Sequence, residues 1–164
     1  MATSSSGEDA GALAMRQVLG RFASGVVVVS GSGPDGPVGF TCQSFFSLSL
    51  DPPLVALAPS RSSATWPHLH RSALFTANVL RDGQADLARS FSRTGVDKFA
   101  GVAWVPGPTG TPHLQGALAW IDCRVEQVHA GGDHHLVVGR VLQLAGGDGR
   151  PLVFYRGRFA SLEG

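Results

Sequence analysis

Two clusters of hydroxyl side chains stand at the edges of apolar runs in the first half of the sequence. The first lies within VGFTCQSFFSLSLDPPLV, residues 38–55, and comprises Thr41, Ser44, Ser47 and Ser49. The second is Ser60-Arg61-Ser62-Ser63, followed closely by Thr65. Small side chains let a flat ring approach the backbone, whose polar groups can then bind its edge. Hydroxyls and unpaired N–H groups at a helix start suit an anion. Together the clusters predict a site for a flat ring that carries a phosphate.

The first cluster also has a purely structural interpretation. Alternate side chains of a strand point to opposite faces. Here both faces would mix serines with large apolar residues, so the segment could be an ordinary strand with an imperfect pattern. The residue types alone leave both interpretations open.

A glycine motif, GSGPDG at residues 31–36, satisfies GxGxxG and follows an apolar run. A dinucleotide-binding loop requires a helix to open within the motif. Here Pro34-Asp35-Gly36-Pro37 is typical of a turn that leads into another strand. The motif therefore predicts a hairpin.

The histidine pairs do not form a metal-site pattern. Adjacent residues of a strand face opposite sides, so His134 and His135 cannot readily ligate one ion. No carboxylate cluster or thiolate pair completes a first shell, and we expect no metal. His68 and His70 are predicted to be ordinary polar residues of a surface helix.

Composition limits the functional classes. The chain has 164 residues, enough for one domain with a substantial core, and a net charge of +1. A net charge this close to zero gives no reason to expect that the protein binds nucleic acid or an anionic membrane. Charged residues make up only 15%, which suits a protein that buries surface in a subunit interface.

The ends of the chain and its cysteines indicate a cytoplasmic protein. No apolar run is long enough to span a membrane, and the N-terminus lacks the pattern of a signal peptide. Cys42 and Cys123 lie far apart within apolar runs, so we expect inert core thiols.

The elements that must position these residues are mostly strands. We expect a disordered tail over residues 1–11, a Pro/Gly-rich loop over 105–116, and helices over 12–23, 62–72 and 82–93. Strands are expected over 25–31, 37–50 with a bend near Gln43-Ser44, 54–58, 74–80, 117–130, 135–145 and 151–159. Because these strands do not alternate regularly with helices, the pattern favours an antiparallel barrel over a doubly wound sheet.

These residues resemble the flavin reductase family, which has the FMN-binding split-barrel fold. The nearer likeness is to small reductase components of two-component flavin-dependent monooxygenases. Two motifs carry most of it: SFxSLSxDPP within residues 44–53 and GDHxxxxG from Gly132 to Gly139. Further likeness lies in RQVLGRFASGVVVVS (16–30), ANVL with DKFAGVAW (77–104), and PLVFYRG (151–157).

The resemblance implies a mainly β domain over residues 12–164, an antiparallel Greek-key split β-barrel that forms a homodimer. The implied activity is that of an NAD(P)H:flavin oxidoreductase. It would reduce FMN or FAD and supply free reduced flavin to a separate oxygenase. The residues do not choose between FMN and FAD, between NADH and NADPH, or between tight flavin binding and a diffusing flavin.

The resemblance also assigns site residues. One segment would lie along the isoalloxazine ring, mainly through backbone groups: Val38, Gly39, Phe40, Thr41, Gln43 and Ser44. A second would hold the ribityl and phosphate end: Ala58, Pro59, Ser60, Ser62, Ser63 and Thr65. Ser90 and Phe91 would approach the cofactor as well.

For the nicotinamide substrate, His134 of the GDH motif is the expected catalytic residue, rather than His135. It would hydrogen-bond to the nicotinamide nucleotide or to the flavin, unless it merely closes the turn. Tyr155 and Arg156 are the other residues expected to contact NAD(P)H, although Arg156 suits a subunit contact or a barrel rim equally well.

Three alternatives remain at this stage. A pyridoxamine-phosphate-oxidase-like enzyme would retain FMN and oxidise a small amine. A non-catalytic flavin-binding module would bind flavin without turnover. A nucleic-acid-binding barrel is disfavoured, because the net charge is near zero and no strand combines aromatic with basic residues.

Overall fold

Strands dominate the structure, a computed structural model that describes residues 5–163. The helices are α1 (Ser5–Leu19), α2 (Trp66–Ser72) and α3 (Ala85–Phe91). The strands are β1 (Ser24–Gly25), β2 (Val27–Gly33), β3 (Gly36–Cys42), β4 (Phe46–Leu50), β5 (Pro53–Leu57), β6 (Leu74–Val79), β7 (Trp104–Pro106), β8 (Pro112–Leu114), β9 (Ala119–Gly131), β10 (His134–Gly146), β11 (Leu152–Tyr155) and β12 (Arg158–Ser161).

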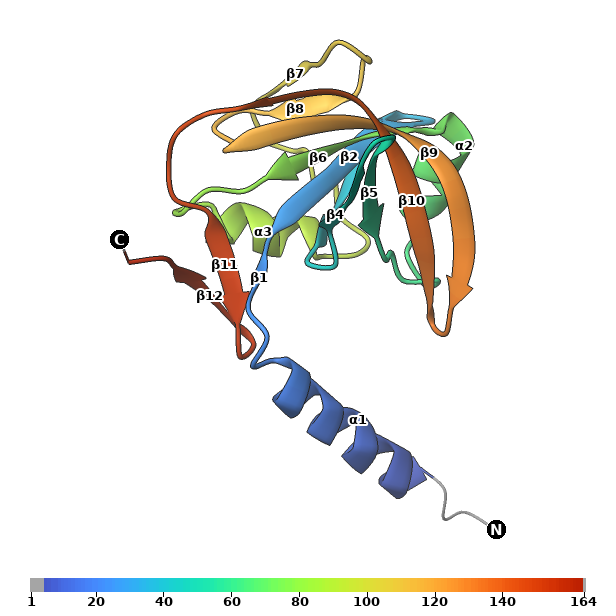
Figure 1. Cartoon of the computed structure of the whole chain (residues 1–164), viewed down its shortest axis with the longest axis vertical. Helices are drawn as coiled ribbons and strands as arrows, with labels where there is room; N and C mark the ends of the chain where they lie inside the picture. Colours follow the sequence, from blue (N-terminus) through green and yellow to red (C-terminus); the bar gives the residue numbers. More distant parts are fainter. Residues whose placement is uncertain (1–4, 164) are drawn as a thin grey trace.

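The main sheet has seven antiparallel strands in the order β3-β2-β6-β9-β10-β5-β4 (Figure 1). This confirms the predicted mainly β, antiparallel architecture. Strands β3 and β4 form opposite edges, although only residues 43–45 separate them in the chain. Four Cα steps span at most about 15 Å, so the sheet must curl until its edges approach. The edges do not pair with each other, and the ladder is not closed.

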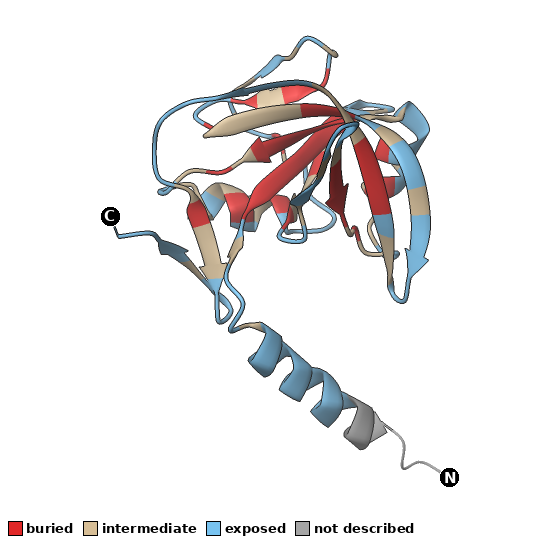
Figure 2. Ribbon diagram, viewed as in Figure 1, coloured by how far each residue is buried: buried red, intermediate tan, exposed pale blue. Residues whose placement is uncertain are grey.

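The core lies on both sides of β2, as expected for its run of valines (Figure 2). Val27 and Val29 pack with Leu57, Phe75 and other residues inside the curled sheet. Val26 and Val28 pack on the other side in a second cluster that includes Phe91 of α3. Because both of its faces are buried, β2 has a continuous apolar sequence rather than an alternating one.

The predicted hairpin at residues 31–36 is confirmed, since Gly33 pairs with Gly36 across the turn from β2 to β3. The expected loop over 105–116 is partly wrong, because it contains a second hairpin, β7–β8. Each of these strands has three residues, too few to show an alternating pattern.

A buried polar network holds the β7–β8 hairpin on the main sheet. The Oδ1 atom of Asp122 in β9 accepts a hydrogen bond from Thr76 at 2.6 Å and lies 2.8 Å from Nε2 of His113 in β8. Asn78 donates to the carbonyl of Val28 and accepts from the amide of Leu114 in β8. Most buried polar atoms of this network thus have a partner in another segment of the chain, while Oδ2 of Asp122 is buried without one.

The N-terminal prediction is wrong for residues 5–11, which are helical: α1 begins at Ser5 rather than at residue 12. Residues 1–4 of the expected tail lie outside the described residues. Adding a helical turn to an existing helix is cheaper than nucleating one, which accounts for the longer element. Helix α1 projects away from the sheets (Figure 1). None of the helices in the described part of the chain is long and apolar enough to cross a membrane.

The last predicted strand, 151–159, is also corrected, because it is a hairpin of β11 and β12 that pairs with β1. Arg156 and Gly157 form the turn with φ of 49° and 76°. Two left-handed residues are what a tight two-residue hairpin turn requires, and glycine supplies the second.

Candidate functional site

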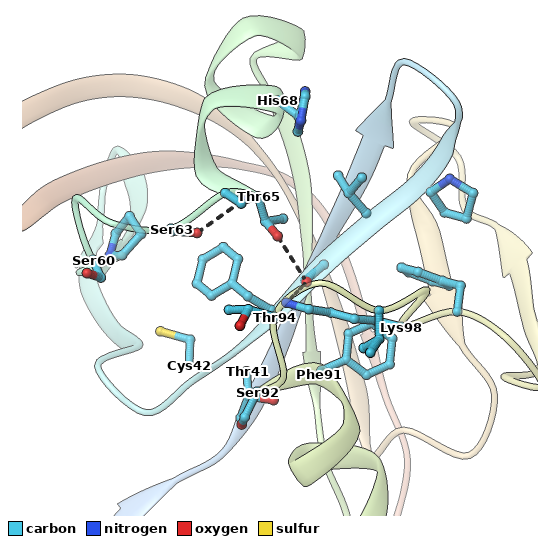
Figure 3. Close-up of a pocket in the computed structure, with 18 of the residues that line it drawn as sticks. Thr41, Cys42, Ser60, Ser63, Thr65, His68, Phe91, Ser92, Thr94 and Lys98 are labelled. Carbon is cyan, nitrogen blue, oxygen red and sulfur yellow. Dashed lines mark hydrogen bonds between the residues drawn. The ribbon is translucent and has the colours of Figure 1, made fainter.

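A cavity of about 1210 Å³ lies beside β3 and the end of β5 (Figure 3). Its walls come from β3 with the β2–β3 turn, from residues 58–65 after β5, and from residues 91–99 after α3. His134, the first residue of β10, completes the lining. Both hydroxyl clusters of the sequence therefore reach one cavity.

Nearly all of the predicted cofactor-binding residues line this cavity. They are Val38, Gly39, Phe40, Thr41, Gln43, Ser44, Ala58, Pro59, Ser60, Ser62, Ser63, Thr65 and Phe91. Ser90 is not among the lining residues, because successive helical side chains diverge by about 100° and Phe91 already faces the cavity. Ser47 and Ser49 lie on β4 and do not line it either.

The hydroxyls of Thr41 and Ser44 hold neighbouring segments rather than face a ligand freely. Thr41 donates to the carbonyl of Ala88 in α3 at 2.6 Å. The Oγ of Ser44 accepts from the amide of Ala58 at 2.9 Å. The cavity surface along β3, called the β3 shelf below, is therefore made mainly of backbone and small side chains. The hydroxyls of Thr41 and Ser44 hold the neighbouring segments in place.

Gly39 is the tightest point of this shelf. A Cβ atom there would lie 3.0 Å from both the Phe91 ring and the carbonyl oxygen of Val29, so any side chain would require these neighbours to shift. The Gly39 carbonyl accepts hydrogen bonds from Thr65 Oγ1 at 3.5 Å and from Lys98 Nζ at 3.1 Å (Figure 3). Phe91 is buried and packs edge-on against Phe99, with ring centroids 5.0 Å apart.

The segment before α2 combines two kinds of hydroxyl. Ser63 Oγ accepts from the amides of Thr65 and Trp66, so it holds the chain at the start of the helix. The hydroxyls of Ser60 and Ser62 lie 2.9 Å apart, and both residues line the cavity. Ser60, Ser62 and Thr65 therefore bring three hydroxyls to this part of the cavity wall.

Lys98 and His68 line the cavity but were missed by the sequence reasoning. His68 was predicted to be an ordinary surface residue. Instead this residue lines the cavity, and the Nδ1 atom of its ring is buried without a hydrogen-bond partner. Burial lowers the pKa of Lys98, because it disfavours the charged ammonium. The one available signal for Lys98 was that it is the sole lysine of the chain.

His134 is held at the cavity by its neighbours. Its Nδ1 atom lies 2.7 Å from Oδ1 of Asp133, and this hydrogen bond lowers the pKa of that carboxyl. A β-bridge to Ser60 fixes its backbone. His135 does not line the cavity, and its ring lies 6.2 Å from the ring of Trp66. His134 thus lines the cavity and His135 does not, while the catalytic role of His134 stays a prediction.

Tyr155 and Arg156 are not brought to the cavity. They lie on the β11–β12 hairpin, where the guanidinium of Arg156 covers the Tyr155 ring at 5.3 Å. The Arg156 amide donates to the carbonyl of Gly20, just after α1. Within one chain the hairpin turn directs them toward α1, and their contact with NAD(P)H stays a prediction.

The two cysteines are free and buried, as expected of core thiols. Burial raises the pKa of Cys42, and burial with the nearby charge of Asp122 raises the pKa of Cys123 to about 12. A thiol that resists ionisation is a poor nucleophile and a poor metal ligand.

The arrangement suits a flat ring with an anionic tail. The glycine and backbone surface of β3 suits a planar group, while hydroxyls of residues 60–65 and the ammonium of Lys98 also line the cavity. The volume exceeds the usual range of about 300–1,000 Å³ for sites that hold one small molecule. The residues present therefore fit a flavin nucleotide and leave room for a second planar substrate.

Comparison with known proteins agrees with this arrangement. A family model described as a flavin reductase like domain matches residues 19–163. The chain is 46% identical over 149 residues, 90% of this chain and 76% of the relative, to the reductase subunit HsaB of a flavin-dependent monooxygenase from Rhodococcus jostii. It is 42% identical to the NADH-dependent FMN reductase SmoA of Agrobacterium fabrum, covering 88% of this chain and 82% of that protein.

Solved structures give the same result. The nitrilotriacetate monooxygenase component B homologue of Mycobacterium thermoresistibile superposes with a TM-score of 0.92 at 42% identity, covering 95% of this chain and 89% of that one. The NADH:FAD oxidoreductase SgcE6 of Streptomyces globisporus, in complex with NAD and FAD fragments, gives 0.88 at 34% identity and covers 93% of each chain. With most of its length matched by sequence and by structure, this chain belongs to the flavin reductase family.

Proposed function

We propose that this protein is an NAD(P)H:flavin oxidoreductase that reduces FMN or FAD and releases reduced flavin to a separate monooxygenase. The observation that carries the proposal is the cavity itself, which joins the β3 backbone shelf, the hydroxyls of residues 60–65 and His134 in one site. Relatives whose names specify FMN or FAD reduction with NADH support the same activity.

The protein's part in this reaction is to position its substrates. The flavin, when bound, supplies the hydride-accepting chemistry. The segment Val38–Ser44 would bind the ring through backbone groups, and the tight packing of Gly39 keeps that surface flat. His134, oriented by the contact of its Nδ1 atom with Asp133, would hydrogen-bond through Nε2 to the nicotinamide nucleotide or to the flavin edge. Orientation of two reactants at short distance is itself a large part of catalysis in such a site.

Delivery to a partner is supported by the names of the relatives. One relative is named as the reductase component of a 4-nitrophenol monooxygenase and another as the reductase subunit of a stachydrine demethylase. By analogy, a separate oxygenase would receive the reduced flavin here. Use of a nicotinamide nucleotide as reductant is consistent with a cytoplasmic protein, which we also propose.

A homodimer is the proposed assembly, and α1 is its main support. Five large apolar side chains of this helix and the turn after it are exposed: Leu13, Met15, Val18, Leu19 and Phe22. Phe22 is 83% exposed, which is unusual for a large apolar residue in a free monomer. A second copy that covers these side chains would remove a large apolar surface from water.

The reductase activity is tested by mixing the protein with NADH and FMN or FAD without oxygen, and following loss of the oxidised flavin absorbance. We expect bleaching far faster than in the absence of protein, with at least one flavin. No acceleration with either flavin, using NADH or NADPH, would reject the proposal. Firmly retained yellow FMN with oxidation of a small amine would instead indicate a pyridoxamine-phosphate-oxidase-like enzyme, and flavin binding without turnover would indicate a binding module.

A further inference from the structure

One end of the cavity has no part in the proposed function. That function places the flavin ring on the β3 shelf and the flavin phosphate near the hydroxyls of residues 60–65. Four further lining residues belong to the β2–β3 turn and the start of β3, and a fifth belongs to α2: Pro34, Asp35, Gly36, Pro37 and His68. These five residues are called the turn end of the cavity below.

His68 reaches the cavity close to the β2–β3 turn. Helix α2 packs on the last part of β2, where a Cβ atom on Gly31 would clash with the side chain of Leu69. Gly31 pairs with Val38, near the start of β3. Figure 3 shows His68 on the helix beyond Thr65, which lies three residues earlier in the chain. Residues three apart in a helix lie on the same face, so His68 continues the wall that Thr65 begins.

The protein does not fix the ring of His68 at its Nδ1 atom. This nitrogen is buried, and no hydrogen-bond partner for it is found among the described residues. Buried polar atoms nearly always have a partner, and for a residue that lines a cavity a ligand can supply it. The second side-chain torsion of histidine has two broad orientations, so the ring can turn either nitrogen toward the cavity. His68 can therefore offer a ligand both a hydrogen bond and a flat face.

The other groups at the turn end suit a nucleoside. Asp35 is exposed at the tip of the turn and lines the cavity. A carboxylate accepts hydrogen bonds from ribose hydroxyls, as it does in dinucleotide-binding proteins. Pro34 and Pro37 add apolar surface without a backbone N–H, and a histidine ring can stack on a base. The turn end contains no lysine or arginine, so it suits a sugar and a base better than a further phosphate.

The wall of the cavity is long enough for such a group. Thr65 donates to the carbonyl of Gly39, which marks the position of the phosphate-binding hydroxyls along β3. The strand begins at Gly36, three residues away, so about 10 Å of wall remains beyond this point at the usual strand spacing.

We propose that the turn end of the cavity, with His68 and Asp35, is a subsite for an adenylate group, the part that FAD has and FMN lacks. The phosphate that FAD shares with FMN would lie near Thr65, and its adenosine would extend toward the turn. Nicotinamide dinucleotides also contain an adenylate, and the test separates these two sources. The inference rests on the proposed flavin reductase function and names the residues that recognise the adenylate part of its substrates.

The test compares FAD with FMN, which share the ring and the first phosphate. Dissociation constants are measured by equilibrium dialysis, without NADH, for the wild type, His68→Ala and Asp35→Ala. We expect each substitution to weaken FAD binding by about tenfold, the value of one hydrogen bond, and to change FMN binding by less than about twofold. The KM for NADH, with FMN as the flavin, is measured for the same variants.

His129→Ala and Asp148→Ala are the matched controls, because both residues are exposed and neither lines the cavity. They should leave the ratio of FAD to FMN affinity unchanged. Urea unfolding of each variant checks that the fold is kept. Asp35 is exposed in a turn, so its variant keeps the test decisive if His68→Ala lowers stability.

Selective weakening of FAD supports the adenylate subsite with FAD as its source. A raised KM for NADH, with both flavins bound as before, supports the subsite with the nicotinamide nucleotide as its source. Equal weakening of FAD and FMN, or no change in any of the three quantities, would overturn the proposal. A wild-type protein that binds both flavins but fails to bleach them with NADH or NADPH rejects the reductase activity, while the comparison of FAD with FMN still stands.

Discussion

The Oγ atom of Ser44 accepts a hydrogen bond from the amide of Ala58, 2.9 Å away, and so joins the turn after β3 to the chain that leaves β5. The same hydroxyl lies 3.2 Å from the Sγ of Cys42. These contacts bridge the place where the two edges of the main sheet separate. A side chain that first suggests a ligand contact thus has a structural role at the cavity wall.

Replacing Ser44 with Ala should therefore lower stability by about 1 kcal/mol, because the Ala58 amide loses its partner. Urea unfolding measures this change. Ser47→Ala is the matched control, since Ser47 is exposed on β4 and lies outside the cavity. Equal effects of the two substitutions would contradict a specific role for the Ser44 hydroxyl.

Replacing His134 with Ala should lower kcat/KM for NADH by about tenfold or more, as loss of one positioned hydrogen bond does. The fold should persist, because the side chain is largely outside the core. Stopped-flow measurement of flavin reduction separates hydride transfer from nucleotide binding.

His129→Ala is the control on the same β9–β10 hairpin, where the ring is exposed and contacts Gln127. It should leave the kinetics unchanged. If His134→Ala keeps wild-type rates, the hydrogen bond to the substrate comes from another residue, and the His134–Asp133 pair only closes the turn.

Introducing a charge on the exposed apolar face of α1 should break the proposed dimer. Val18→Asp and Phe22→Asp each place a carboxylate where a second copy would bury apolar surface, and burying an unpaired charge is costly. Light scattering after size-exclusion chromatography should then show mass falling from two copies toward the 17.1 kDa of one chain.

Gln127→Asp adds the same charge to an exposed residue of β9 rather than of α1 and should leave the dimer intact. If the wild type is itself a monomer at micromolar concentration, α1 is not a dimer contact. The same conclusion follows if all three variants remain dimeric.

The thiol of Cys123 should make the protein less stable at alkaline pH. Its folded pKa is raised from 9.0 to about 12, so between these values the unfolded chain loses a proton that the folded chain keeps. The free energy of unfolding therefore falls as pH rises through this window, by at most about 1.4 kcal/mol per pH unit from this group.

Urea unfolding of wild type and Cys123→Ala at pH 8 and pH 10 tests this. The variant starts from lower stability, since it leaves a small cavity, but its loss between the two pH values should be smaller. Cys42, whose pKa is also raised by burial, contributes in the same direction in both proteins. Parallel losses in the two proteins would show that Cys123 does not ionise on unfolding in this range.

Much of this fold could be predicted because local signals agree with the tertiary structure. The valine run of β2 and the glycine turn to β3 determine that hairpin without distant contacts. The bend at Gln43-Ser44 was visible as polar residues that interrupt an apolar run, and the chain does leave β3 there. Thr41 and Ser44 of the first hydroxyl cluster and Ser60, Ser62, Ser63 and Thr65 of the second do line one cavity, whereas Ser47 and Ser49 do not.

Other features depend on partners distant in sequence and could not be predicted. The Lys98 ammonium reaches a carbonyl 59 positions away, from a loop that has no periodic pattern. His113 and Asp122 form a pair only because β8 folds back on the sheet. Arg156 was assigned to the nicotinamide nucleotide by resemblance, yet a left-handed turn directs it toward α1.

The single lysine has a practical consequence for following ligand binding to this protein in solution. Apart from the chain's own amino terminus, Lys98 provides the only primary amine, and it stands in the wall of the cavity. Protein labelled with nitrogen-15 in lysine alone would give one backbone amide signal in a two-dimensional NMR spectrum. That one signal would report arrival and departure of each flavin and nucleotide, without any label attached to the substrates.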